Sequence, residues 1–150
     1  LEERGVLLSD IVECVVHLQK DFIDEINEDE ILEIVEGVLG KREVQLALLT
    51  GINIDIQVEN NQFGSERIQE IIRVDEGLYG IDEVLAYGIC NLYGSIALTN
   101  YGYIDRVKPG IIGELNDISN GKCNTFLDDI VGAIAAAAAS KLAHSQITNM

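Results

Sequence analysis

Apolar residues recur at helical spacing along most of this 150-residue chain. A spacing of three and four residues places apolar side chains on one face of an α-helix. This pattern predicts helices that begin near Ser9, Asn27 and Ser65, and residues 41–49 have the same spacing. The clearest repeat predicts a fully apolar helix face, whose members are Ile81, Val84, Leu85, Gly88, Ile89 and Leu92.

Two segments carry mixed signals. Residues 52–58 alternate apolar and polar side chains, which is typical of a strand, but a lone strand would have no partner, so we expect a helix there. Residues 91–110 are rich in Gly and Tyr and end in Pro109-Gly110, which predicts a helix end followed by a structured loop. A short helix is expected over residues 111–116.

The last helix is strongly apolar and begins with charge. Residues 130–139 contain only Gly, Ala, Ile and Val, and Asp128 and Asp129 come directly before them. We expect Thr125 to cap this helix, with Asp128 at the third helical position. The run of ten apolar residues is too short to span a bilayer, which takes about 20. The pattern therefore predicts a buried helix.

These elements predict an all-α fold. We expect residues 1–150 to form a single domain, a bundle of about six helices around a central apolar helix. The chain is 47% hydrophobic and contains one Pro, which favours a compact helical protein over a disordered one. The small residues of the last helix favour a close-packed interface, and we expect a homodimer.

Charge and cysteine content narrow the function. Ten basic residues face 26 acidic ones, which gives a net charge of −16 and argues against nucleic-acid binding. An acidic protein that binds phosphate would need a divalent metal to supply positive charge. The three cysteines are far apart and no cationic leader segment is visible, so we expect a reduced, cytoplasmic location.

Two pairs of adjacent acids stand at the starts of apolar helices. They are Asp82-Glu83 and Asp128-Asp129. Bundle proteins hold divalent ions with carboxylates from facing helices, and oxygen ligands favour Mg²⁺, Mn²⁺ or Ca²⁺ over Zn²⁺. Gly132 and the alanines beyond it would let a second helix approach closely. The alternative is that first-turn acids are stabilised by the helix dipole without any metal.

Basic residues are few, and two places could contact phosphate. Lys41 and Arg42 form the only adjacent basic pair, and Lys108 stands before Pro109-Gly110. Each could equally be an ordinary solvated charge.

Four sequence blocks, in order over residues 35–145, carry a family resemblance. They are "KREVQ-x-A-x-LTGI", "DEGLYGIDEVLA", "TNYGYID-x-x-KPGI" and "TFLDDIVGAIAAAAAS-x-LAH". Together they resemble the soluble, Gram-positive branch of the phosphatidylglycerophosphatase A family, also labelled low-temperature-requirement C protein. Membrane members of that family carry an Asp-Glu-x-x-Gly motif, which residues 128–132 match with Asp in the second position.

The resemblance implies an all-α, Mg²⁺-dependent phosphatase of phosphatidylglycerophosphate, an enzyme of phospholipid synthesis. Asp128 and Asp129 would be catalytic, with Mg²⁺, or Mn²⁺ in its place, held by Asp82, Glu83, Asp128 and Asp129. The phosphate contacts would be Lys41, Arg42 and Lys108.

Other functions stay open at this point. The substrate could be a soluble phosphomonoester, or a lipid reached by peripheral contact with the inner face of the membrane. The rival to an enzyme is a non-catalytic structural or regulatory helical protein, which could still bind a metal. The distinguishing observation is whether the two acidic pairs meet in space.

Overall fold

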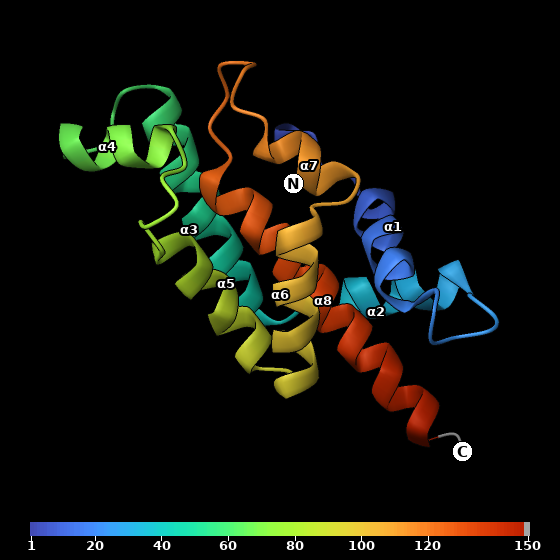
Figure 1. Cartoon of the computed structure of the whole chain (residues 1–150). Helices are drawn as coiled ribbons and strands as arrows, with labels where there is room; N and C mark the ends of the chain where they lie inside the picture. Colours follow the sequence, from blue (N-terminus) through green and yellow to red (C-terminus); the bar gives the residue numbers. More distant parts are fainter. Residues whose placement is uncertain (149–150) are drawn as a thin grey trace.

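The computed structural model describes residues 1–148, and the regular secondary structure of this part of the chain is helical throughout (Figure 1). The predicted all-α class is confirmed, with eight α-helices in these residues instead of about six. A 3₁₀ turn at Glu2–Arg4 precedes α1 (Leu8–Gln19), α2 (Glu28–Leu39), α3 (Arg42–Glu59), α4 (Glu66–Arg73), α5 (Ile81–Asn91), α6 (Ser95–Val107), α7 (Ile111–Asn116) and α8 (Thr125–Thr148).

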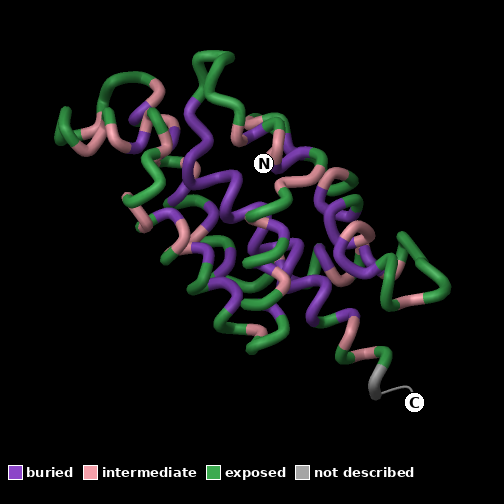
Figure 2. The backbone as a smooth tube through the Cα atoms, in the orientation of Figure 1, coloured by how far each residue is buried: buried purple, intermediate pink, exposed green. Residues whose placement is uncertain are grey.

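Helix α8 is the centre of the bundle, as predicted. It packs against α1, α2, α3, α5, α6 and α7, and every residue from 123 to 140 is buried (Figure 2). A helix that is apolar on all sides must be covered on all sides, which explains why its neighbours surround it. Over residues 1–148, no helix combines the length and the apolarity that crossing a bilayer requires.

Helix α3 resolves the mixed signal at residues 52–58, where the predicted helix is confirmed. Its buried residues are Val44, Leu48, Gly51, Asp55 and Val58, which recur every three or four positions. Gly51 lies at the crossing with α8. A Cβ at this position would lie 2.3 Å from Cδ1 of Ile130 and 3.2 Å from Cβ of Phe126. The glycine therefore lets the two helices approach closely.

Helix α6 is where the prediction was wrong, because a structured loop was expected over most of its length. Tyr101 and Ile104 are buried against α8, where they pack around Gly132. Glycine inside a helix, such as Gly102, costs about 1 kcal/mol relative to alanine. Burying two large side chains contributes more than this, about 1.5–3 kcal/mol for each aliphatic or aromatic residue. Tertiary packing thus overrides the local signal.

The predicted apolar face of α5 was only partly right. Its member Ile89 is buried, whereas Ile81 and Val84 are 53% and 62% exposed. The buried face also carries Asp82 and Ala86. Helix α5 is apolar on two sides, so periodicity alone could not choose between them. The structure turns the side with the acid toward α8.

Candidate metal centre

Helix α5 presents its acids from its first turn. Gly80 precedes the helix with φ of 76°, a left-handed conformation that glycine adopts without strain. Asp82 and Glu83 follow directly, and the amino end of a helix favours negative charge. Asp82 is only 3% exposed, and Glu83 is half-buried.

The start of α8 is capped differently from the prediction. The hydroxyl of Thr125 does not cap its own helix: it donates to the carbonyl oxygen of Ile72, at 2.5 Å. The carboxyl group of Asp55 on α3 accepts the backbone N–H groups of Phe126 and Leu127, at 3.0 and 2.9 Å. Asp128 therefore stands at the fourth helical position rather than the third.

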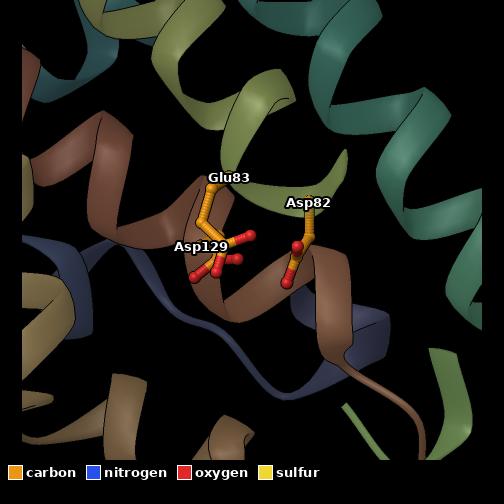
Figure 3. A group of neighbouring side chains, drawn as sticks. All are labelled: Asp82, Glu83 and Asp129. Atoms are coloured by element: carbon orange, nitrogen blue, oxygen red, sulfur yellow. The ribbon is translucent and has the colours of Figure 1, made fainter. Parts of the chain in front are cut away.

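The two acidic pairs meet between α5 and α8. Carboxylate oxygens of Asp82, Glu83 and Asp129 lie within 4.8 Å of one another (Figure 3). A divalent cation binds carboxylate oxygens at about 2.0–2.6 Å. One ion between these three side chains could therefore contact all of them after small movements. Three of the four acids expected to face one another therefore lie together, and Asp128 is not among them.

Asp128 faces a lysine instead. Its carboxylate lies 3.6 Å from Nζ of Lys108, which lies 3.0 Å from a carboxylate oxygen of Asp105. Lys108 ends α6 in a left-handed conformation, with φ of 50°. This places the ammonium group between the carboxylates of α6 and α8, close enough for the charge of Asp129 to act on it. The centre thus combines several acidic side chains with one basic side chain, Lys108.

The pKa values of these acids are strongly raised, because one lysine cannot balance the negative charge of several carboxylates. Burial, followed by the charge of Asp128, raises the pKa of Asp129 to about 12. Burial raises the pKa of Asp128 to about 8, although Lys108 opposes this. A hydrogen bond with Asp82, followed by burial, raises the pKa of Glu83 to about 7. Each shift means that the ionised form lacks compensating positive charge.

Two carboxylate oxygens lack partners. Oδ1 of Asp128 and Oε2 of Glu83 are buried, and neither has a hydrogen-bond partner within residues 1–148. A buried polar atom without a partner is destabilising, and native proteins contain few of them. Oxygen atoms from carboxylates are the ligands that Mg²⁺ and Mn²⁺ prefer. The residues present therefore fit a hard divalent cation.

Sequence reasoning missed two acids of this centre. They are Asp105 on α6 and Asp75, which lies before α5. Both contribute to the raised pKa of Asp128. Asp105 belongs to no acidic pair, and the pair Asp75-Glu76 lies before Gly77 instead of at the start of an apolar helix, so the pattern that identified the other acids did not include them. Asp105 could have been found from its spacing, because it stands one helical turn before Lys108. Asp75 adopts a left-handed conformation, with φ of 51°, which no sequence signal indicated.

The predicted phosphate contacts fall into two places. Lys108 belongs to the centre, whereas Nζ of Lys41 lies 4.9 Å above the ring of Tyr93. The carbonyl oxygen of Tyr93 accepts a 3.5 Å hydrogen bond from Ser140, twelve residues beyond Asp128 on α8. That separation is about 18 Å along a helix. The structure therefore does not bring Lys41 and its neighbour Arg42 to the acids.

The centre is reached through residues that are only partly covered. The side chains of Lys108 and Asp105 are 29% and 30% exposed, and Glu83 is half-buried. The cleft of about 560 Å³ between α1 and α2, lined by Leu8, Val12 and Leu32 among others, lies apart from the acids. The partly exposed members of the centre therefore lie on α5 and at the end of α6.

Comparison with known proteins adds a family to this geometry. Residues 5–144 match the family model described as Phosphatidylglycerophosphatase A. Uncharacterized protein YutG from Bacillus subtilis (strain 168) is 57% identical over 144 residues, which cover 96% of this chain and 86% of YutG. The crystal structure of low temperature requirement C protein from Listeria monocytogenes is 55% identical, with a TM-score of 0.94. That match covers 97% of this chain and 91% of the Listeria chain.

A second solved structure agrees with this fold. A protein of unknown function from Bacillus stearothermophilus is 59% identical, with a TM-score of 0.93. The match covers 97% of this chain and 89% of that chain. Two independent solved structures thus share the arrangement of helices that builds the centre.

Proposed function

The chain belongs to the phosphatidylglycerophosphatase A family, and on this premise we propose that it is a metal-dependent phosphatase of phosphatidylglycerophosphate. The observation that carries the proposal is the meeting of Asp82, Glu83 and Asp129 beside Lys108. A phosphomonoester carries concentrated negative charge, so its hydrolysis requires mainly charge neutralisation and positioning. A centre of acids with a lysine next to it suits that chemistry once a cation is bound.

The residues divide into two roles under this proposal. Asp82, Glu83, Asp128 and Asp129 would hold Mg²⁺ or Mn²⁺. Such an ion supplies positive charge to a phosphate group and activates water for attack. Lys108 would donate hydrogen bonds to a phosphate oxygen, and Asp105 would orient the lysine through their 3.0 Å contact. The orphaned oxygens of Asp128 and Glu83 support the metal part of the proposal.

Phosphate release tests the proposal directly. Purified protein would be supplied with phosphatidylglycerophosphate in detergent micelles, with Mg²⁺ or with a chelator. We expect release with Mg²⁺ only, and none from an Asp129→Asn variant. A soluble phosphomonoester such as glycerol phosphate would be tested alongside, to separate a lipid phosphatase from a general one. Metal binding without phosphate release from either substrate would refute the proposed phosphatase activity. The protein would then be a metal-binding protein without this activity.

We also propose that the protein works as a homodimer at the inner face of the membrane, in peripheral contact with its lipid substrate. Within Ile81–Asn91, the exposed side chains are uncharged, and they include Ile81, Val84 and Tyr87. Two copies of a chain with a net charge of −16 repel each other least where such a surface meets its own copy. The exposed side of α5 is therefore the surface that we assign to the dimer.

A further inference from the structure

We infer that Asp55, on α3, is a positioning residue of the metal centre. It would fix the first turn of α8 against α3 and thereby aim Asp128 and Asp129. The inference rests on the proposed function, in that the centre it serves is the proposed metal site.

The first support is the bonding of Asp55. Its two carboxyl oxygens accept the N–H groups of Phe126 and Leu127, the second and third residues of α8. A residue at the N-cap position of the same helix normally satisfies these two donors. Here Asp55 satisfies them, although it lies 71 positions before Phe126 and 72 positions before Leu127 in the chain. The start of α8 is therefore bonded to a second helix, one to three residues before Asp128 and Asp129.

The second support is that the local cap is occupied elsewhere. Asn124 stands at the N-cap position, where its side chain could bond to its own helix. Instead, Oδ1 of Asn124 accepts a 2.9 Å hydrogen bond from Arg4. Capping alone would not require a buried acid from another helix. The arrangement links the helix end to α3, which a local cap could not do.

The third support is the row of residues to which Asp55 belongs. Gly51, Asp55 and Glu59 follow one another at four-residue spacing, so they lie on one side of α3. Gly51 admits the side chains of Phe126 and Ile130. Glu59 accepts the backbone N–H of Cys123, at 2.8 Å. One side of α3 thus contacts residues 123–130 in order, and Asp55 is its middle member.

Arg4 completes this support from the opposite end of the chain. It donates to the carbonyl oxygen of Cys123 at 2.7 Å and forms an ion pair with Glu59 at 3.1 Å. The segment that enters α8 is thus held through its backbone on both sides of residue 124. A helix end fixed in this way can place two carboxylates with the accuracy that a metal centre requires.

The test compares two variants that each weaken a helix cap. Asp55→Asn replaces one acceptor by an NH₂ group that faces a backbone N–H. Asn27→Ala is the matched control, because Asn27 caps α2 through two similar bonds, at 3.1 and 3.2 Å. We expect both variants to lower the melting temperature. Only Asp55→Asn should weaken Mn²⁺ binding, measured by calorimetry, by about tenfold or more. Equal Mn²⁺ affinity in Asp55→Asn and the unmodified protein would overturn the inference.

A double variant keeps the test decisive if Asp55→Asn folds poorly. Asp55→Asn with Asn124→Asp places an acid at the local cap position but does not restore the bond to α3. We expect the double variant to regain melting temperature without regaining Mn²⁺ affinity. Recovery of both would show that Asp55 is only a cap and would overturn its positioning role.

Amide hydrogen exchange separates this inference from the proposed function. If the unmodified protein binds no Mn²⁺, the proposed metal site fails, whatever Asp55 does. Exchange at the Phe126 and Leu127 amides then decides whether Asp55 holds α8. Selectively faster exchange at these two amides in Asp55→Asn supports the bond to α3. Unchanged exchange overturns the inference independently of any metal.

Discussion

Lys108 and Asp128 face each other at 3.6 Å, although they come from helices that are separate in the sequence. The lysine also lies 3.0 Å from Asp105, so one ammonium group serves two carboxylates. Burial lowers the pKa of Lys108, but the interaction with Asp128 and the hydrogen bond with Asp105 outweigh this effect, so the pKa is raised. The lysine is therefore charged at neutral pH, as a phosphate-binding group must be.

Lys108→Gln tests that role. We expect kcat/KM for phosphate release to fall by about 10²-fold, because a preorganised donor to the phosphate is lost. Lys20→Gln, which removes a charge from the exposed end of α1, serves as the control and should leave the activity unchanged. Lys41→Gln tests the prediction made from sequence. Since Lys41 lies at the far end of α8, a loss as large as that of Lys108→Gln would contradict the structural assignment.

Asp129→Asn separates a metal centre from a stabilised helix start. At 100 times its dissociation constant, Mg²⁺ or Mn²⁺ should stabilise the unmodified protein by about 2.7 kcal/mol, or about 5–10 °C in melting temperature. The variant should lose this response, and without metal it should melt no lower than the unmodified protein, because the amide replaces a carboxyl group that is already protonated there, with a pKa of about 12.

The helix dipole alone predicts a different result for Asp129→Asn. The substitution would then lower the free energy of unfolding by at most about 1 kcal/mol, and metal would not change the melting temperature of either protein. Glu33→Gln on the exposed side of α2 removes the same charge away from the centre. It should keep the full metal response, measured by thermal melts with and without metal.

The stability of the metal-free protein should depend on pH through Asp55. Burial raises the pKa of Asp55 from its ordinary 3.8 to about 7, although the N–H donors of Phe126 and Leu127 oppose this. The folded protein therefore holds a proton that the unfolded chain has already released. The contribution of this group is complete below the ordinary pKa and is lost as pH rises through about 7.

The comparison with Asp55→Asn isolates this effect, because the asparagine side chain at position 55 does not titrate. Between about pH 5 and about pH 8, the free energy of unfolding of the unmodified protein should fall by about 2–3 kcal/mol relative to the variant. Urea unfolding with a chelator present measures it. A difference that stays constant with pH, or that grows in the opposite direction, would refute the assignment.

Gly51→Ala should disturb the crossing of α3 and α8. The added Cβ would meet Cδ1 of Ile130, and overpacking of this kind costs about 1–3 kcal/mol. Adding Ile130→Val removes that Cδ1 atom and should recover part of the loss, which a double-mutant cycle in urea would measure. Gly102→Ala is the control, since a Cβ there meets no atom within 4 Å. It should stabilise α6 by about 0.5–1 kcal/mol.

Val84→Glu tests the proposed dimer. This position is 62% exposed on α5, so the substitution should leave the folded monomer intact. Light scattering at micromolar concentration should give a dimer mass for the unmodified protein and a monomer mass for the variant. A monomer mass for both would refute the dimer. The reverse substitution on α2, Glu33→Val, would show whether an exposed valine by itself causes association.

Much of the helical framework could be predicted from local pattern. The central position of α8 follows from ten consecutive apolar residues, because a helix that is apolar on every side is removed from water only when other elements cover every side. The single acid within residues 52–58, Asp55, was present as a signal but was not used. Asp55 stands on the buried stripe of α3 with Gly51 and Val58, and a buried acid on such a stripe must have a partner.

Hydrophobic periodicity and composition alone indicate that two acidic pairs begin apolar helices and that one of these helices is central. Which acids meet depends on the tertiary packing. It turned Asp82 of α5 inward, brought Lys108 and Asp105 to Asp128 by forming α6, and left Lys41 at the far end of α8. The physical reason is that helix periodicity fixes only which residues share a face. The choice among faces, and the distance between two carboxylates, depends on how small residues such as Gly51 and Gly132 let neighbouring helices pack.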